Sequence, residues 1–252
     1  MTAASFFHRQ MPTTFPHEFD RRAAQYEQHA PVQREAAAWL AEWLPEKIES
    51  PALEVGAGTG FFTRHLTGRT ERLVASDISP RMAQAGRQAV PEVGWIVADA
   101  TTPPEDGGYH WIFNCSLVQW LPDPAAAFRA WHHAAAPGAR LVSGWFLRGT
   151  MDEFFSACPE AAPFVWRDAD EWKDLLAQSG WTIRRDEAKS FVRHHTDSVA
   201  MLREVHNAGA VIPRRIGIGK LRQALRKYDR DHRSDAGVRS TFNFLRVEAV
   251  RS

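Results

Sequence analysis

The fold is decided by the stretch Leu53-Glu54-Val55-Gly56-Ala57-Gly58-Thr59-Gly60-Phe61-Phe62. The apolar run over 52–55 predicts a β-strand, the three glycines at alternate positions predict a sharp turn, and residues 61–66 predict the start of a helix. Glycine lets the backbone turn sharply and lets a ligand approach where a Cβ would clash. A helix start adds unpaired N–H groups and a positive dipole end. The turn therefore predicts a site for a flat, polar or anionic ligand.

The glycine spacing narrows the choice of ligand. A dinucleotide-binding G-x-G-x-x-G would place its third glycine at position 61, but Phe61 stands there and the third glycine is Gly60. The sequence follows the pattern E-x-G-x-G-x-G from Glu54 to Gly60. That pattern resembles motif I of class I S-adenosylmethionine-dependent methyltransferases.

Two acidic residues follow later strands at suitable positions. Asp77 ends a strand over 72–76 and lies 17 residues past Gly60, near the ~20 expected for a carboxylate that binds both ribose hydroxyls. Asp99 follows a strand over 94–97, where the methyltransferase pattern has an acidic residue that meets the adenine amino group. Together with the glycine turn, these residues predict S-adenosylmethionine binding. The alternative is an incidental set of polar strand ends.

Strand and helix patterns alternate five times with short loops, which predicts a parallel sheet with helices on both faces. We expect a Rossmann-like α/β fold with a seven-stranded, mostly parallel sheet. A helical insertion precedes a last, antiparallel strand. The expected strands cover 52–55, 72–76, 94–97, 111–115, 140–146, 181–187 and 241–250. The expected helices cover 19–30, 32–43, 61–66, 79–89, 123–135, 149–157, 168–179 and 197–235.

Length predicts a single domain for these 252 residues. We divide it into an N-terminal helical cover over 1–45, a cofactor-binding core over 51–193, a basic helical insertion over 195–238 and a last strand over 241–250. Ligands of such sheets bind beyond the carboxyl ends of the strands. The glycine turn, Asp77, Asp99 and residues 116–120 are all expected there.

Composition excludes several classes of protein. The apolar content of 44%, the charged content of 24% and the net charge of +1 are those of an ordinary globular protein and favour neither nucleic acid nor membrane as a partner. No apolar run approaches the ~20 residues of a membrane span. Residues 1–16 lack a secretory pattern, so we expect a cytoplasmic protein. Two cysteines, Cys115 and Cys158, predict neither a disulfide framework nor a zinc site.

The histidine pairs 132–133 and 194–195 are poor metal ligands, because neighbouring residues on a helix point about 100° apart. We therefore expect no metal. The insertion is more distinctive, since residues 203–239 hold ten Lys/Arg and four Asp/Glu, a net charge of +6 against −5 elsewhere. Arg222, Arg226 and Arg230 recur every four residues on one helix face. They form either a solvated face or a docking surface for an acidic partner.

Three segments resemble the malonyl-acyl-carrier-protein O-methyltransferases of biotin synthesis. The run Phe19 to Gln33 is similar to the amino-terminal helix of that family. The run Asn114 to Trp120 is similar to its S-N-x-x-x-Q-W segment, although Asn114-Cys115-Ser116 departs from the start of it. The run from Leu202 to Gly209-Ala210 is similar to L-K-x-x-G-A, with His206 where the family usually has lysine.

The resemblance implies methyl transfer from S-adenosylmethionine to the free carboxylate of malonyl on acyl carrier protein, toward a pimeloyl precursor of biotin. It implies substrate-positioning roles for Tyr26, Gln119 and Trp120, with Arg148 and His206 as weaker candidates. The carrier would dock on Arg222, Arg226 and Arg230. The residues expected to bind the cofactor are Tyr26, Gln33, Glu54, Gly56, Ala57, Gly58, Gly60, Asp77, Ile78, Met82, Asp99, Ala100 and Ser116.

Two other functions remain open from the sequence. The first is a class I methyltransferase acting on a small free acid or another metabolite, which would need no basic docking surface. The second is a non-enzymatic partner protein that keeps the cofactor fold, although the intact glycines and both aspartates speak against it. A nucleic-acid amino-methyltransferase is disfavoured, because Asn114-Cys115-Ser116 stands where N-P-P-[YF] would be needed.

Overall fold

The computed structural model describes residues 15–104, 108–162, 165–208 and 216–252. Residues 1–14 lie outside these ranges, and so does the Gly209-Ala210 part of the family resemblance. Among the described residues, no helix combines the length and the apolar character needed to cross a membrane.

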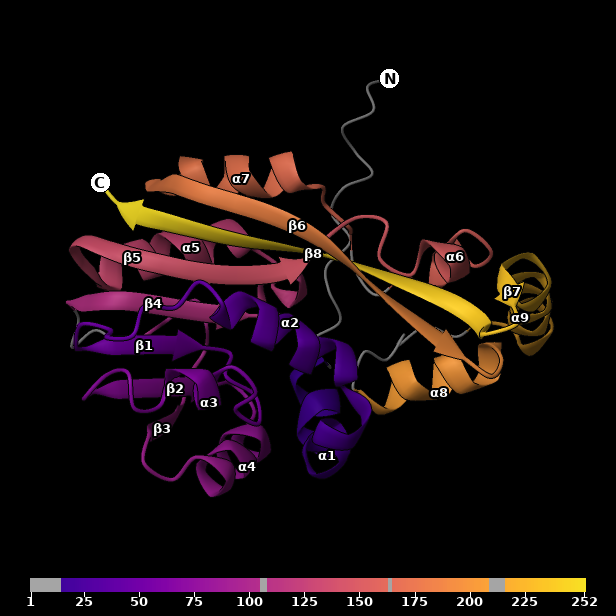
Figure 1. Cartoon of the computed structure of the whole chain (residues 1–252), viewed down its shortest axis with the longest axis horizontal. Helices are drawn as coiled ribbons and strands as arrows, with labels where there is room; N and C mark the ends of the chain where they lie inside the picture. The colour runs from indigo at the N-terminus through magenta and orange to yellow at the C-terminus, as the bar shows by residue number, and fades with distance from the viewer. Residues whose placement is uncertain (1–14, 105–107, 163–164, 209–215) are drawn as a thin grey trace.

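An eight-stranded sheet forms the centre of the molecule, as Figure 1 shows. Its main path runs β3-β2-β1-β4-β5-β8-β6, and the two-residue β7 pairs with β8 beside that path. The first five strands pair in parallel, and β8 is antiparallel to both of its neighbours. The predicted mixed sheet is therefore confirmed. The strands are β1 Ala52–Val55, β2 Leu73–Asp77, β3 Gly94–Val97, β4 Tyr109–Cys115, β5 Ala135–Phe146, β6 Trp181–His195, β7 Arg233–Ser234 and β8 Gly237–Arg251.

The helices cover both faces of this sheet. On one face, Trp131 of α5 and Trp172 of α7 pack with Leu53 of β1. On the other, Leu40 of α2 and Trp95 of β3 belong to the cluster that α3 and α4 also join. The helices are α1 Phe15–His29, α2 Pro31–Ala41, α3 Thr63–Leu66, α4 Pro80–Ala89, α5 Pro124–Ala134, α6 Asp152–Phe155, α7 Ala169–Gln178, α8 Ser198–Asn207 and α9 Ile218–His232, with short 3-10 turns η2 Val118–Trp120 and η3 Pro159–Ala161.

Local sequence signals place several helix starts as expected. The Ser79 hydroxyl accepts from the backbone N–H of Met82, with Pro80 in the first turn of α4. Asp123 caps α5 in the same way. Asp168 and Glu171 form a reciprocal capping box at the start of α7. These starts are decided by residues close in the chain, which is why the sequence predicts them well.

Longer elements differ from the prediction where distant contacts decide them. The strand predicted to end at residue 187 continues to His195, because β6 pairs with β8 as far as His195↔Val238. Since β5 ends at the Phe146↔Phe244 pair, a β6–β8 ribbon extends past the rest of the sheet to α8 and α9 (Figure 1). Charged side chains did not end this strand, because β6 is an edge strand in which residues 184–190 are all exposed to water.

Four predicted segments are shorter, are divided or start elsewhere. The helix expected over 61–66 is reduced to the four residues of α3. The helix expected over 149–157 is also four residues, because Met151 before it takes a left-handed φ of 53°. Residues 197–235 are not one helical block but α8, α9 and β7 within the described part. Strand β5 begins at Ala135 rather than Arg140, and its pairing with β4 shifts register around the turn-forming Pro137-Gly138.

The extended ribbon has its own core. Phe242 and Phe244 of β8, Phe191 of β6, Met201 of α8 and Tyr228 of α9 belong to one buried cluster. Helix α2 also contributes to this cluster through Trp39. The insertion is therefore packed onto the helical cover, and together they form walls around the carboxyl ends of the strands.

Candidate functional site

A large cavity of about 500 Å³ lies beyond the carboxyl ends of β1, β2, β3 and β4. Its volume lies in the range of roughly 300–1,000 Å³ typical of cofactor and small-molecule sites. All of the cofactor residues predicted from the sequence line it, with the exception of Gly60. Its wall also contains residues for which the sequence predicts no cofactor contact, among them Phe19, Phe61, Thr101 and Leu117.

The glycine turn forms the floor of this cavity. Gly56 has φ of 69°, and a Cβ there would stand 2.6 Å from Leu117 Cδ2. Gly58 has φ of 58° and open space where its Cβ would be, so a ligand can approach its main chain. Gly60 turns away instead, because its Cβ position lies 3.3 Å from Val90 Cγ2 in the core. Gly60 thus shapes the turn from behind, which explains its absence from the lining.

Asp77 ties the turn to the end of β2. Its Oδ2 accepts from the backbone N–H of Gly58 at 2.9 Å, and its Oδ1 accepts from that of Ser79 at 2.9 Å. Burial raises the pKa of Asp77, and the two backbone donors act in the opposite direction. A carboxylate has more acceptor positions than these two bonds use. The fixed Asp77 side chain can therefore still accept from ligand hydroxyls.

Asp99 is held differently. Its Oδ1 accepts from both the backbone N–H and the hydroxyl of Thr101, each at 2.7 Å. The side chain is exposed at the rim of the same cavity. It lies one strand further along the sheet than Asp77, because β3 pairs with β2. The two carboxylates therefore meet successive parts of any ligand that lies across the strand ends.

The buried carboxyl group of Glu54 shows whether the chemistry of the cavity matches S-adenosylmethionine. Its side chain is buried, and Oε2 has no hydrogen-bond partner. Burial, with a smaller contribution from the charge of Asp77, raises the pKa of Glu54 to about 8. An unpaired carboxyl group of this kind matches a ligand that brings an ammonium group. The methionine part of S-adenosylmethionine carries one, so the residues present fit this cofactor.

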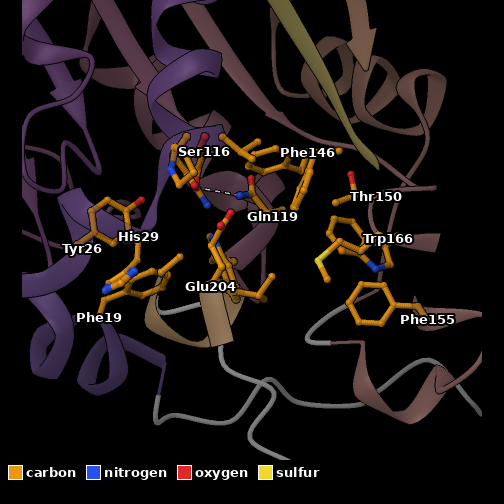
Figure 2. Close-up of a pocket in the computed structure, with 18 residues that line it drawn as sticks. Phe19, Tyr26, His29, Ser116, Gln119, Phe146, Thr150, Phe155, Trp166 and Glu204 are labelled. Atoms are coloured by element: carbon orange, nitrogen blue, oxygen red, sulfur yellow. Dashed lines mark hydrogen bonds between the residues drawn. The ribbon is translucent and has the colours of Figure 1, made fainter. Parts of the chain in front are cut away.

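A second, smaller cavity of about 90 Å³ adjoins the first and shares lining residues with it. Figure 2 shows Tyr26, His29 and Phe19 on one side of it and Trp166 and Phe155 on the other, with Gln119 between them. Five residues line both cavities, namely Phe19, Tyr26, Gln33, Ser116 and Trp120. Of the predicted substrate-positioning residues, Tyr26 and Trp120 therefore stand at the junction of the two cavities, and Gln119 lines only the second.

The junction is built on a strained turn after β4. Ser116 is a non-glycine residue with φ of 63°, and its N–H donates to Gly144 O at 2.8 Å. One N–H of Gln119 Nε2 donates to Ser116 O at 2.9 Å. Because that carbonyl oxygen can only accept, the amide points its Nε2 toward it. Gln119 Oε1 is buried and has no hydrogen-bond partner among the described residues.

Helix α1 covers the junction. The ring of Phe19 meets Trp120 edge-on at 5.3 Å, and the ring of Tyr26 lies 5.6 Å from Phe61. Asp20 Oδ1 accepts from the Ser79 hydroxyl at 2.8 Å, which fastens the helix to the start of α4. Phe19 and Phe61 belong to the segments that the sequence analysis singled out, but only the fold shows that both turn toward the ligand.

Two predicted substrate residues line neither cavity. Arg148 pairs with Asp168 at 3.2 Å and with Glu171 at 2.7 Å, and so holds the start of α7. His206 is exposed, and its Nε2 lies 2.7 Å from an Arg22 nitrogen, so it links α8 to α1. The sequence resemblance suggested both residues as substrate contacts. In the structure their side chains instead bind residues of other helices or helix starts.

The described residues contain no group of three His, Cys, Asp or Glu side chains arranged to hold a metal ion. The predicted docking arginines Arg222, Arg226 and Arg230 are exposed on α9. They lie away from the face that buries Ala224 and Tyr228.

Comparison with known proteins agrees with this geometry. A family model described as a methyltransferase domain matches residues 53–143. Malonyl-acyl-carrier-protein O-methyltransferase of Hahella chejuensis is 28% identical over 242 residues, covering 89% of this chain and 85% of that protein. The protein of the same name from Herminiimonas arsenicoxydans is 26% identical over 252 residues, covering 93% of this chain and 94% of that protein. The resemblance seen in the sequence is confirmed.

Other matches are longer than this chain. A biotin biosynthesis bifunctional protein of Bordetella avium is 30% identical over 225 residues, which are 84% of this chain but 48% of that protein. In another, from Cellvibrio japonicus, the match is 29% identical and spans 58% of this chain and 30% of that protein. This chain thus spans less than half of the bifunctional relatives that it matches.

Solved structures agree on the fold. A methyltransferase structure from Bacillus halodurans C-125 aligns with a TM-score of 0.65 and 14% identity, covering 86% of this chain and 99% of that one. A protein described as a cyclase aligns with a TM-score of 0.58 and 16% identity over 86% of this chain and 81% of that one. Because proteins of different chemistry share it, the fold by itself does not select a reaction.

Proposed function

We propose that this chain, a class I S-adenosylmethionine-dependent methyltransferase, methylates the free carboxylate of malonyl carried on acyl carrier protein. The named relatives that match most of the chain support this acceptor. The observation that carries the proposal is the junction of the two cavities at Tyr26, Gln33, Ser116 and Trp120. A methyl donor in the larger cavity and a carboxylate held at this junction would meet there. The proposed place of reaction is the cytoplasm.

The reaction needs no catalytic base. A malonyl carboxylate is already ionised at pH 7, and S-adenosylmethionine supplies a methyl group activated by its positively charged sulfur. The bond from the methyl carbon to sulfur breaks, its electron pair stays on sulfur, and a carboxylate oxygen forms the new bond. No proton is transferred. The contribution of the protein is to hold the two groups in line, and positioning of this kind can lower a barrier by about 7–11 kcal/mol.

Hydroxyl groups at the junction are suited to hold the carboxylate. Burial raises the pKa of Tyr26 above its ordinary value, so the phenol stays protonated and can donate. Ser116 offers a second hydroxyl on the rigid turn after β4. Trp120, held by Phe19, supplies an apolar wall that excludes water from the methyl group. Neither cavity is lined by a described lysine or arginine, so this clamp relies on neutral donors.

Helix α9 is the proposed dock for the acidic carrier. Among the described residues, Arg222 and Arg226 have no ion-pair partner, whereas Arg230 pairs with Asp231 at 2.7 Å. Lys220 and Lys227 are also paired, with Glu160 and Asp231. On the described helix α9, these two unpaired arginines are the cations available to a partner, and we place the carrier's acidic surface against them.

Charge reversal tests this dock. Arg222→Glu combined with Arg226→Glu replaces attraction by repulsion at two exposed sites. At about 1 kcal/mol for each site, the KM for malonyl carrier should rise roughly 30-fold at low salt. The affinity for S-adenosylhomocysteine, measured by titration calorimetry, should not change. The control combines Arg129→Glu on α5 with Arg184→Glu near the start of β6, the end of that strand opposite to α8 and α9; both residues are exposed. An equal KM in both double variants would exclude α9 as the dock.

The function itself is tested by methyl transfer with purified protein. We expect turnover of malonyl-acyl-carrier protein to exceed that of free malonate by a large factor. We also expect the gene to rescue a biotin-requiring strain that lacks its malonyl-methylating enzyme. Faster turnover of free malonate or aconitate would replace this proposal by a methyltransferase of small free acids.

A further inference from the structure

The second cavity is much smaller than the cofactor cavity. It measures about 90 Å³, against about 500 Å³ for the cofactor cavity. Its wall is mainly apolar, with Val32 from α2, Phe146 from β5, Phe155 from α6 and Phe242 from β8. A thin, unbranched segment can enter such a space with few polar atoms to desolvate.

Two polar side chains of this cavity, Gln119 and Glu204, present hydrogen-bond acceptors beside the hydroxyl donors of Tyr26 and Ser116. Gln119 is 5% exposed, and its Oε1 is buried without a partner while Nε2 is held by Ser116 O. A buried acceptor left unpaired costs free energy, and a ligand that brings an N–H group would satisfy it. The side chain lines only the second cavity, not the cofactor cavity.

Glu204 of α8 adds a carboxylate to the same wall. Its ion-pair partner in the described structure is His195, with Nδ1 3.7 Å from Oε2. His195 Nε2 lies 2.9 Å from the Ser240 hydroxyl, and burial lowers the pKa of His195 although Glu204 acts against it. The imidazole is therefore mostly neutral near pH 7 and leaves the charge of Glu204 uncancelled. His195 itself does not line the cavity, and His29 is the one side chain with a titratable nitrogen among the described lining residues.

A wall of this composition disfavours an anion. A malonyl carboxylate placed there would face Glu204 without a lysine or arginine among the described lining residues. An amide-bearing chain brings N–H donors and carries no charge. The carboxylate is better placed at the junction, beside the hydroxyls of Tyr26 and Ser116, where it also meets the cofactor cavity.

We propose that the second cavity is a subsite for the amide-bearing arm of a pantetheine thioester, in which Gln119 Oε1 accepts an amide N–H and Glu204 keeps carboxylates out. This inference rests on the proposed function, since it assumes a thioester-linked malonyl group. It adds that the enzyme recognises the arm by a hydrogen bond, in addition to recognising the carrier by charge.

The test uses two substrates that differ at one atom. S-malonyl-N-acetylcysteamine has an amide N–H next to its thioester chain, and the matching S-malonyl-2-acetoxyethanethiol has an ester oxygen in its place. With S-adenosylmethionine in excess, the kcat/KM of the wild-type protein should be at least about 5-fold higher for the amide, the effect of one hydrogen bond to a buried acceptor.

Variants then assign the preference to Gln119. Gln119→Leu should bring the ratio of the two kcat/KM values close to one, and Gln119→Glu, which keeps an acceptor, should restore part of it. Val205→Ala is the matched control, because it removes apolar contact from the same wall and should lower both values alike. Circular dichroism and affinity for S-adenosylhomocysteine show that each variant is folded. A wild-type ratio near one, or a ratio that Gln119→Leu leaves unchanged, overturns the subsite.

A binding measurement separates this inference from the proposed function. If the two thioesters are turned over equally, the function stands and the subsite is wrong. If no malonyl substrate is turned over, the function is wrong, and titration of pantetheine into protein saturated with S-adenosylhomocysteine decides the subsite. Binding that weakens at least about 5-fold in Gln119→Leu supports it, and absent or equal binding refutes it.

Discussion

Replacing Glu54 by glutamine should change how the stability of the free protein depends on pH. Glu54 is buried, its Oε2 is unpaired, and burial raises its pKa to about 8 from an ordinary 4.5. Between these two pH values the unfolded chain has lost the proton while the folded protein keeps it. The folded state therefore binds more protons, and its stability falls as pH rises across this window.

The size of the effect follows from the width of the window. Stability changes by ~1.4 kcal/mol per pH unit while the folded state holds one extra proton, so the loss from pH 4.5 to about 8 sums to about 5 kcal/mol. Glutamine has nearly the same shape and does not ionise. Glu54→Gln should therefore gain about 3–5 kcal/mol relative to the wild type between pH 5 and pH 8.

Urea unfolding at pH 5, 6, 7 and 8 measures this difference in the absence of ligand. The exposed Glu92→Gln is the control, and its stability should follow that of the wild type at every pH. Two parallel curves for wild type and Glu54→Gln would refute the reasoning, because they would mean that Glu54 ionises in the folded protein as it does in the unfolded chain.

Ligand binding provides a second readout of the same group. With a pKa of about 8, Glu54 is ~90% protonated at pH 7 in the free protein. An ammonium group beside it favours the ionised form. Binding of S-adenosylhomocysteine should then release nearly one proton in the wild type and none in Glu54→Gln. Calorimetry in buffers of different ionisation enthalpy measures this number, and no release from the wild type would contradict the placement of the ammonium group.

Further predictions concern the junction, the cover and the core. Tyr26→Phe should lower kcat/KM for malonyl carrier about 10- to 100-fold, while calorimetry shows an unchanged affinity for S-adenosylhomocysteine; loss of both would place the hydroxyl in the cofactor site. Asp20→Ala removes the bond that fastens α1 to α4, so limited proteolysis should cut α1 faster, and an unchanged rate would show that other contacts hold it. Gly86→Ala would bring a Cβ to 2.1 Å from Trp95 and should cost about 1–3 kcal/mol in urea unfolding, whereas Gly219→Ala, with no atom within 4 Å, should be neutral or stabilising.

The cofactor site could be predicted from the sequence because short-range patterns encode it. The three glycines lie in one turn and have positive φ angles, which favour glycine. Asp77 accepts a hydrogen bond from the backbone N–H of Gly58 in that turn. Parallel pairing then brings Asp99 to the same edge of the sheet. Ligands of parallel α/β sheets bind beyond the carboxyl ends of the strands. Once the alternation of strands and helices is known, the position of these residues at the ligand edge of the sheet therefore follows.

The second cavity could not be predicted in the same way. Its wall combines residues from α1, α2, η2, α6, α8 and β8, which are far apart in the chain and meet through the β6–β8 ribbon and its packing on α2. The same distant contacts direct Arg148 to Asp168 and Glu171, and His206 to Arg22, away from both cavities. Sequence spacing gives no signal for such pairings.

The sequence by itself therefore determined the sheet, the glycine turn and the acidic residues at the strand ends that line the large cavity, because each depends on neighbours within a few residues or on strand order. Only the tertiary structure decided that Gly60 supports the turn from the core side, that Gln119 keeps an unpaired oxygen, and that Glu204 joins it across the cavity. These features depend on which side chains meet after the insertion packs on the helical cover, and packing of that kind is a property of the whole chain.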